Sequence, residues 1–197
     1  MRDGESTDLH AKLAQTRLLA MDVDGVLTDG TLGYSSEGAE ERRFHVADGL
    51  GLVALRQTGI LIAWVSGRAN PLVERRAREL GVPHILQGVR DKGAALERLT
   101  RELTLDLARV AYIGDDWNDL PAFEAVGVRI AVAGAAREVV TAADYVTDRR
   151  GGQGAVREVC EMILDALDQR DACLRAYLDS VRAPEDRVSI QDEAPSP

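Results

Sequence analysis

The amino-acid sequence predicts an α/β fold with a doubly wound parallel sheet of the Rossmann type. Short apolar segments alternate with longer helical segments along the chain, and the connections between them are short. This alternation is typical of parallel strands joined by crossover helices on both faces of one sheet. Polar side chains also follow several apolar segments, and open α/β sheets place their ligands at the carboxyl ends of strands.

The elements of this sheet can be placed in order along the chain. Asn70-Pro71 is suited to open a helix, and Gly59 and Gly81 are suited to end one. The strands are expected near residues 17–23, 60–65, 84–86, 109–113, 128–132 and 144–147. The helices are expected near residues 49–58, 70–80, 91–103, 118–126, 136–142 and 153–169.

Length and composition agree with one enzyme-sized domain. The chain has 197 residues, of which 45% are hydrophobic, and this is enough for one core. We expect an N-terminal extension over residues 1–16, the main domain over 17–170, and a C-terminal part over 171–197. Arg170 to Leu178 extends the last helix or forms another, and the Pro-, Asp- and Glu-rich Ala183 to Pro197 is predicted to be a disordered tail.

The segment between the first two core strands predicts a β-hairpin. Residues alternate along Gly30 to Val46, and Ser35-Ser36-Glu37-Gly38 is expected at the tip. A hairpin of this length is too short to bury much surface. We therefore expect a short flap rather than a cap domain.

Charge and residue usage argue against several classes of function. The net charge of −9 argues against nucleic acid and anionic membrane surfaces as partners. Residues 1–16 lack the charged-then-apolar pattern of a signal segment, and no apolar run approaches ~18 residues, so the cytoplasm is the expected location. Cys160 and Cys173 lack metal-ligand spacing and are interpreted as ordinary thiols.

Two carboxylates end the first apolar segment. The run that begins at Leu18 is apolar and β-prone, and it ends in Asp22-Val23-Asp24-Gly25. Side chains at positions i and i+2 of a strand share a face, so Asp22 and Asp24 can converge on one metal and one phosphate. An ordinary strand end followed by an Asp-Gly turn is the alternative.

Two further segments add a hydroxyl group and cations. Ser66-Gly67-Arg68 follows the apolar segment 61–65, where Ser66 and neighbouring backbone N–H groups could hold phosphate oxygens. Lys92 lies at the start of a predicted helix. In isolation the first is also compatible with a surface turn and the second with a solvated lysine.

A cluster of acids follows a later strand. Residues 109–113 are followed directly by Gly114-Asp115-Asp116, and Asp119 comes three residues later. Carboxylates this close repel one another unless a cation lies among them, so a divalent metal is the natural interpretation. The dipole of a following helix favours acids in its first turn, but this explains only one or two of the three.

In this order, these segments resemble the haloacid dehalogenase superfamily and, within it, the 3-deoxy-D-manno-octulosonate 8-phosphate phosphatase family. The resemblance covers about Arg17 to Leu164. The matching segments are Asp22–Asp29, Glu41–Gly49 with Phe44-His45-Val46, Ser66-Gly67-Arg68, Gly114–Asp119 and Gly151–Glu158.

The resemblance implies a Mg²⁺-dependent phosphatase that forms an aspartyl-phosphate. Asp22 would be the nucleophile, and Asp24 the general acid and base, with its backbone carbonyl on the metal. Asp115 would complete the Mg²⁺ site with Asp22. Lys92 and Ser66 would bind the phosphoryl oxygens.

Other residues receive supporting or substrate-binding roles from the same resemblance. Asp116 and Asp119 would hold metal-bound waters and orient Lys92. The residues themselves suggest two more contacts: backbone near Gly67 could hold phosphate oxygens, and Arg68 and Arg76 are cations available to bind anionic groups of the substrate. His45, near Asp48, is either an active-site contact or a hairpin-packing residue. The predicted site residues are Asp22, Asp24, His45, Asp48, Ser66, Gly67, Arg68, Arg76, Lys92, Asp115, Asp116 and Asp119.

The expected partner is a small anionic phosphorylated sugar, and its identity is left open by two departures from the pattern. Similar phosphatases carry basic residues where this chain has Ala47 and Val53. The 9-phosphate of a sialic-acid-type sugar is therefore an alternative to 3-deoxy-D-manno-octulosonate 8-phosphate. A noncatalytic assembly module also remains an alternative, while the short flap disfavours a phosphomutase.

The resemblance also implies a homotetramer. Related phosphatases without a cap pair their hairpins, and a neighbouring C-terminal segment approaches the site. The glycine-rich segment Gly151 to Gly154 is expected to be flexible enough to reach an adjacent subunit.

Overall fold

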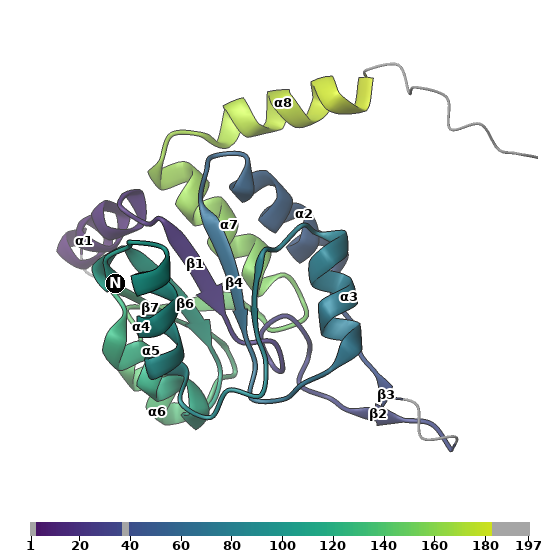
Figure 1. Cartoon of the computed structure of the whole chain (residues 1–197). Coiled ribbons are helices and arrows are strands. Elements are labelled where there is room, and N and C mark those ends of the chain that lie inside the picture. The colour runs from purple at the N-terminus through teal and green to yellow at the C-terminus, as the bar shows by residue number, and fades with distance from the viewer. Residues whose placement is uncertain (1–2, 37–39, 183–197) are drawn as a thin grey trace, which may run out of the picture.

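The computed structural model describes residues 3–36 and 40–182, and it confirms the predicted α/β fold (Figure 1). Six parallel strands form one sheet in the order β5-β4-β1-β6-β7-β8. The strands are β1 (Leu18–Met21), β4 (Leu61–Val65), β5 (His84–Leu86), β6 (Val110–Gly114), β7 (Val128–Ala133) and β8 (Tyr145–Arg150).

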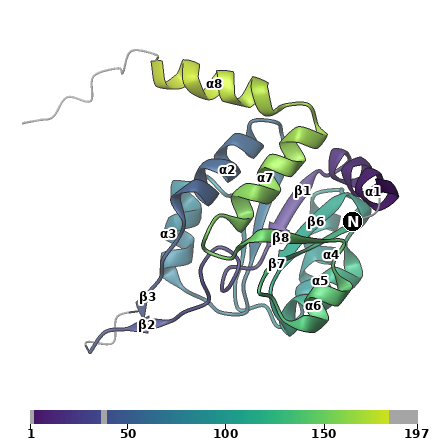
Figure 2. The same ribbon diagram turned by 180° about the vertical axis from the view of Figure 1, so that it is seen from behind.

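Helices cover both faces of this sheet, as Figures 1 and 2 show from opposite sides. Alternate residues of β1 enter different cores: Leu19 and Met21 pack with α1, α2, α3 and α7, whereas Leu18 and Ala20 pack with α4, α5 and α6. The helices are α1 (Asp3–Ala14), α2 (Val46–Arg56), α3 (Pro71–Glu79), α4 (Lys92–Glu102), α5 (Leu120–Ala125), α6 (Arg137–Ala142), α7 (Ala155–Ala166) and α8 (Arg170–Arg182).

Helix starts follow the local signals in the sequence. The Asn70 side chain accepts a hydrogen bond from Leu72 N, and Pro71 occupies the first turn of α3. Asp91 caps α4 in the same way, by accepting from Ala94 N. The cap places Lys92 at the first position of α4, at the edge of the sheet where the site lies.

The helices near the C-terminal end and after β6 show two details that the sequence left open. The predicted helix 153–169 is α7, which ends at Ala166, and Asp168 then adopts a left-handed backbone conformation with φ 55°. Residues 170–182 therefore form another helix, α8, rather than an extension of α7. The predicted helix 118–126 begins as one 3₁₀ turn, η2 (Trp117–Asp119), before α5. A second 3₁₀ turn, η1 (Leu107–Arg109), precedes β6. The N-terminal extension contains α1, which no pattern in the sequence had predicted.

The predicted flap is present as a small antiparallel hairpin. Its strands, β2 (Gly33–Tyr34) and β3 (Glu40–Glu41), pair outside the main sheet. Figure 1 shows the hairpin projecting beyond the end toward which β1 points, with α8 at the opposite end. Part of the expected tip, residues 37–39, and the expected tail, residues 183–197, lie outside the described residues.

Strand order brings the motifs to one edge. β1 lies between β4 and β6, and all three strands run in the same direction. The loops after these strands carry Asp24, Ser66 and Asp115, so segments far apart in sequence meet at the carboxyl ends of neighbouring strands. Within the described part of the chain, no helix is long and apolar enough to cross a membrane.

Candidate active site

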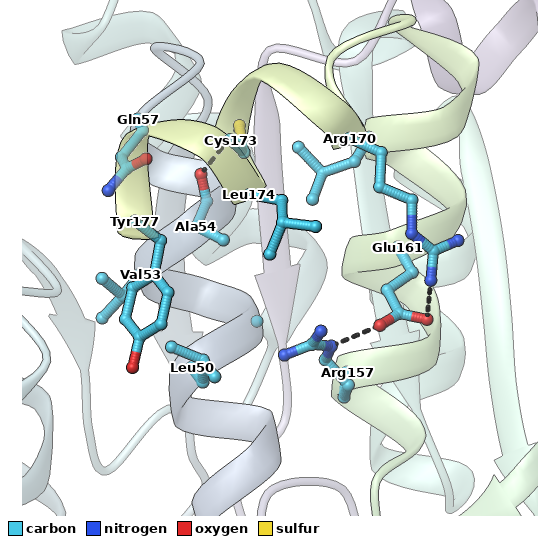
Figure 3. A pocket seen from close by; sticks show the side chains of 12 residues that line it. Leu50, Val53, Ala54, Gln57, Arg157, Glu161, Arg170, Cys173, Leu174 and Tyr177 are labelled. Atoms are coloured by element: carbon cyan, nitrogen blue, oxygen red, sulfur yellow. Dashed lines mark hydrogen bonds and ion pairs between the residues drawn. The ribbon is translucent and has the colours of Figure 1, made fainter. Parts of the chain in front are cut away.

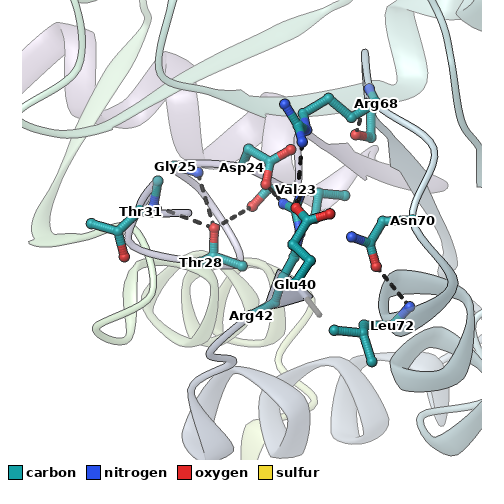
Figure 4. Close-up of polar contacts among 12 residues, drawn as sticks. Val23, Asp24, Gly25, Thr28, Thr31, Glu40, Arg42, Arg68, Asn70 and Leu72 are labelled. Carbon is teal, nitrogen blue, oxygen red and sulfur yellow. Dashed lines mark hydrogen bonds and ion pairs between the residues drawn. The ribbon is translucent and has the colours of Figure 1, made fainter. Parts of the chain in front are cut away.

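The turn after β1 positions the two carboxylates. Asp22 is buried, and its backbone N–H continues the sheet ladder by donating to Ile113 O at 3.0 Å. Gly25 has φ 95°, and a Cβ at this position would overlap the Asp115 carboxylate, so glycine is required here. The Thr28 hydroxyl accepts from Gly25 N at 3.3 Å and donates to Val23 O at 3.3 Å, which closes the turn (Figure 4).

Lys92 is fully buried, and its charge is matched by two acids. Its Nζ lies 2.8 Å from Asp22 Oδ1 and 2.6 Å from Asp119 Oδ1. Burial opposes the charged form of the lysine, but the two carboxylates outweigh burial and raise the pKa of Lys92 above its ordinary value. A buried ammonium group held this way supplies fixed positive charge beside the Asp22 carboxylate.

Asp119 organises the acid cluster. Its Oδ1 also accepts from the Tyr112 hydroxyl at 2.7 Å, and its Oδ2 accepts from Asp115 N at 2.8 Å and from Asp116 N at 3.3 Å. Both of its oxygens are therefore already engaged. This arrangement suits a residue that orients Lys92 and the loop after β6 rather than one that binds a metal directly.

Carboxylate oxygens of Asp22, Asp115 and Asp119 lie within 4.8 Å of one another, as in a site for a divalent cation. Burial and the Asp22 and Asp119 carboxylates raise the pKa of Asp115 to about 8. Burial and the Asp119 carboxylate, opposed by Lys92, raise the pKa of Asp22 to about 6. Asp115 Oδ1 is buried without a hydrogen-bond partner among the described residues, so a cation bound there would satisfy it.

The acids open into a cavity of about 380 Å³. The loop after β4 forms another side of it, where the Ser66 hydroxyl is buried and accepts from Arg68 N at 3.1 Å. The cavity is lined by Asp22, Asp24, Gly30, Gly67, Arg68, Asp115, Asp116, Trp117 and Asn118.

Three predicted substrate contacts lie elsewhere in this chain. His45 lines a separate cavity with Ala47, Arg149 and Arg157, and buried Asp48 accepts from Arg157 N at 2.7 Å. Arg76 lines a cavity against α3 and pairs with Glu79 at 3.2 Å. Their proposed contacts with substrate stay predictions.

Val53 lines another cavity, of about 260 Å³, between α2, α7 and α8 (Figure 3). Leu50, Leu174 and Tyr177 supply apolar surface there, while Glu161 pairs with Arg157 and Arg170 at one side. The Val53 side chain, at one of the two positions where the family resemblance led us to expect a basic residue, is matched by apolar surface of α8.

The glycine-rich segment before α7 packs on its own chain, although it was expected to be flexible. Gly152 N donates to Val26 O at 2.9 Å, and a Cβ at Gly151 would overlap the backbone at Gly25. Side chains here would displace the turn that carries Asp24. In this chain the segment therefore supports the loop after β1.

Sequence reasoning had not selected three residues at the site. Arg42 contacts Asp24, Tyr112 contacts Asp119, and Trp117, a residue that is 65% exposed, lines the cavity. The position of Tyr112 two residues before Gly114 in a buried strand was the available signal, since buried tyrosine hydroxyls usually have a partner.

Comparison with known proteins places the chain in a family. A family model for haloacid dehalogenase-like hydrolases matches residues 82–159. The 3-deoxy-D-manno-octulosonate 8-phosphate phosphatase KdsC of Escherichia coli K12 is 43% identical over 166 residues, which cover 84% of this chain and 88% of that protein.

Two solved structures of such phosphatases are similar along most of their length. The enzyme from Moraxella catarrhalis, in complex with magnesium ion, phosphate ion and a KDO molecule, has 47% identity and a TM-score of 0.85, covering 87% of this chain and 98% of the other. The cobalt-bound enzyme from Haemophilus influenzae has 40% identity and a TM-score of 0.81, covering 85% and 99%. The chain therefore belongs to the haloacid dehalogenase superfamily and, within it, to the 3-deoxy-D-manno-octulosonate 8-phosphate phosphatase family.

Proposed function

We propose that this protein is a Mg²⁺-dependent phosphatase that hydrolyses 3-deoxy-D-manno-octulosonate 8-phosphate through an aspartyl-phosphate. The observation that carries the proposal is the buried Lys92 beside Asp22, with Asp115 completing an acid cluster at the cavity. The identity to enzymes of this name supports the choice of substrate.

In the first step, an Asp22 carboxylate oxygen attacks phosphorus in line, and the bond between phosphorus and the sugar oxygen breaks. The electron pair of that bond leaves with the sugar oxygen. Asp24, two residues along and lining the same cavity, donates its proton to that oxygen. The products of this step are the sugar and phospho-Asp22.

In the second step, water attacks the phosphorus of phospho-Asp22 and gives a proton to Asp24. The bond between phosphorus and the Asp22 oxygen breaks, which restores the carboxylate and releases inorganic phosphate. Lys92 and the backbone near Gly67 bind phosphoryl oxygens in both steps, and the loop around Ser66 holds this side of the cavity in place.

Asp22, Asp115 and the backbone carbonyl of Asp24 would hold the Mg²⁺ ion. When bound, the ion offsets the repulsion between an anionic nucleophile and an anionic phosphate. Asp116 lines the cavity and could hold a metal-bound water, while Asp119 keeps Lys92 and the loop in place.

The carboxylate of a sugar-acid substrate requires a positively charged partner, and Ala47 and Val53 cannot supply one. Arg68 lines the cavity and its side chain is 48% exposed, so it can meet a carboxylate of the substrate. The 9-phosphate of a sialic-acid-type sugar is the second candidate, favoured by Ala47 and Val53 at usually basic positions.

Phosphate release from a substrate panel tests the proposal. The panel holds the octulosonate 8-phosphate, sialic-acid-type 9-phosphates and simple sugar phosphates, each with Mg²⁺ and with chelator. A clear preference for the octulosonate ester supports the assignment, and preference for a 9-phosphate replaces it. Equal, slow turnover of every ester would overturn the substrate assignment and leave the proposed phosphatase mechanism standing. An Asp22→Asn variant that keeps substantial activity would overturn the nucleophile.

We propose in addition that the chain assembles as a homotetramer, as the family resemblance implies, and that it works in the cytoplasm, as the sequence pattern predicts. An open cavity beside a short hairpin supports assembly, since a neighbouring subunit could cover it. Light scattering after size-exclusion chromatography is expected to give four times the 21.4 kDa chain mass. A stable monomer at micromolar concentration would contradict it.

A further inference from the structure

Arg42 is a buried cation at the base of the hairpin. It directly follows β3, and its side chain is only 1% exposed. Arginine is seldom buried unless acids pair with it, because the desolvation of its charge has to be compensated. Arg42 has two such partners: Nη1 contacts Asp24 Oδ1, and Nη2 lies 2.8 Å from Glu40 Oε1 (Figure 4).

These contacts extend into a row of alternating charges across the cavity rim. Glu40 Oε1 also lies 3.4 Å from Arg68 Nη2, which in turn lies 3.4 Å from the Tyr34 hydroxyl. Asp24 belongs to the loop after β1 and Arg68 to the loop after β4, so hairpin residues join two loops that are distant in sequence. The hairpin is thus tied to both sides of the cavity.

Asp24 depends on this row for its orientation. Its side chain is 23% exposed, and among the described residues Arg42 is the charged side chain with which it forms an ion pair. A guanidinium group presents its N–H donors in a rigid planar fork, so it can fix the plane of a carboxylate, which a lysine cannot do. Arg42 Nε is buried without a hydrogen-bond partner among those residues, so the guanidinium group is held by its Nη contacts with Asp24 and Glu40.

We propose that Arg42 is a positioning residue that holds the Asp24 carboxylate toward the oxygen of the leaving group. The inference rests on the proposed function, in which Asp24 protonates that oxygen. A general acid acts only when it lies within hydrogen-bond reach of the atom that it protonates. Without Arg42, Asp24 rotates and reaches the leaving oxygen less often, while Asp22 and Lys92 keep their positions.

This role predicts a dependence on the leaving group. A sugar alkoxide needs a proton as it departs, whereas p-nitrophenolate departs without one. Arg42→Met is therefore expected to lower kcat/KM for the sugar phosphate about tenfold or more, part of the 10²–10⁴-fold typical of general acid catalysis. For p-nitrophenyl phosphate the expected loss is less than about threefold, because transfer to Asp22 then does not need Asp24. Since kcat/KM reports the steps up to phosphoryl transfer, the later hydrolysis does not obscure the comparison.

A double-mutant cycle isolates the path through Asp24. Arg42→Met, Asp24→Asn and the double variant are compared on the sugar phosphate, and Arg42→Met is expected to have no further effect in the Asp24→Asn background. Arg43→Met is the matched control, because Arg43 is the next residue, carries the same charge and is 79% exposed in its side chain. The control is expected to keep the activity of the unaltered protein.

Two results would overturn the proposal: equal losses on both esters, or a further loss in the Asp24→Asn background. If Arg42→Met does not fold, Arg42→Lys keeps the charge without the fork, and it is expected to lose activity on the sugar ester selectively. Failure of the proposed function has a different signature, because the unaltered protein would then fail to hydrolyse sugar phosphates or Asp24→Asn would leave their turnover unchanged.

Discussion

The Tyr112 hydroxyl donates to Asp119 Oδ1 at 2.7 Å, the same oxygen that lies 2.6 Å from Lys92 Nζ. Tyr112 is fully buried in β6, and burial together with the nearby acids raises the pKa of its hydroxyl well above the ordinary value. The hydroxyl therefore remains a proton donor at every working pH. One buried carboxylate is thus held from two elements, the central strand β6 and the start of α4.

Tyr112→Phe is expected to lower the free energy of unfolding by about 1.5–3 kcal/mol, the usual worth of a hydrogen bond to a charged group. Asp119 keeps its contacts with Lys92 and with the loop after β6. The folded variant should therefore keep most of its activity although its free energy of unfolding is lower. Denaturant unfolding and steady-state kinetics measure the two effects. Tyr145→Phe is a control that removes a hydroxyl bonded to Glu158, away from the cavity. An unchanged midpoint would contradict the assigned contact.

Lys92→Met is expected to destabilise the fold by about 3–5 kcal/mol, because it leaves two buried carboxylates without their cation. The loss should shrink as the pH is lowered, since Asp22, whose pKa burial raises to about 6, can then take up a proton. Lys12→Met is the comparison: Lys12 pairs with Asp8 at the exposed surface, where ion pairs contribute about 0–1 kcal/mol. A loss below about 1 kcal/mol for Lys92→Met would show that the buried pair is not intact in solution.

The catalytic edge could be predicted from sequence because its signals are local. Asp22 and Asp115 each follow an apolar strand, and Lys92 follows a helix-capping aspartate. Parallel strands place such residues at one edge, whatever the details of packing. The roles of these residues stay predictions, but their meeting point follows from the strand order.

The inward position of Arg42 and the helix α1 could not be predicted, because they depend on long-range contacts that a sequence pattern does not contain. The hairpin has two residues in each strand, so nothing in its sequence indicates that Arg42 turns inward to Asp24 while Arg43 faces solvent. Likewise, α1 is mostly polar and attaches through Leu9 and Leu13 to the core around α7. In both cases long-range packing decides the outcome.

Removing the metal is expected to make stability depend on pH in a defined direction. Folding raises the pKa of Asp115 to about 8 and that of Asp22 to about 6, from an ordinary value of 3.8. Between the ordinary and the raised values the folded chain binds more protons than the unfolded chain. The free energy of unfolding contributed by these groups therefore falls as the pH rises toward 8.

Magnesium competes with these protons, so its stabilising effect should grow over the same interval. Thermal unfolding between pH 6 and pH 8, with chelator and with Mg²⁺, measures both trends. Asp115→Asn removes the carboxyl with the higher of the two pKa values, so both trends with pH should become weaker. The prediction would be contradicted if, with chelator, the unaltered protein gained more stability toward pH 8 than the Asp115→Asn variant does.

Trp117 is expected to contact the sugar part of the substrate. The residue is 65% exposed and lines the cavity that holds Asp22 and Asp115. Its Nε1 donates to Glu138 Oε2 at 2.9 Å, which fixes the ring plane. Trp117→Ala should raise KM for the sugar phosphate about threefold to tenfold, the range expected for loss of an aromatic contact. It should change kcat little, because the ring does not touch the reacting atoms.

Acetyl phosphate, which has no sugar, serves as the control substrate and should show no such change in KM. The second tryptophan, Trp64, is fully buried in β4, so a Trp64→Phe background assigns the emission to Trp117. Binding of the sugar product should then change the fluorescence in proportion to occupancy. Equal effects of Trp117→Ala on both phosphates, or emission that does not respond to the sugar, would contradict a contact between this ring and the sugar.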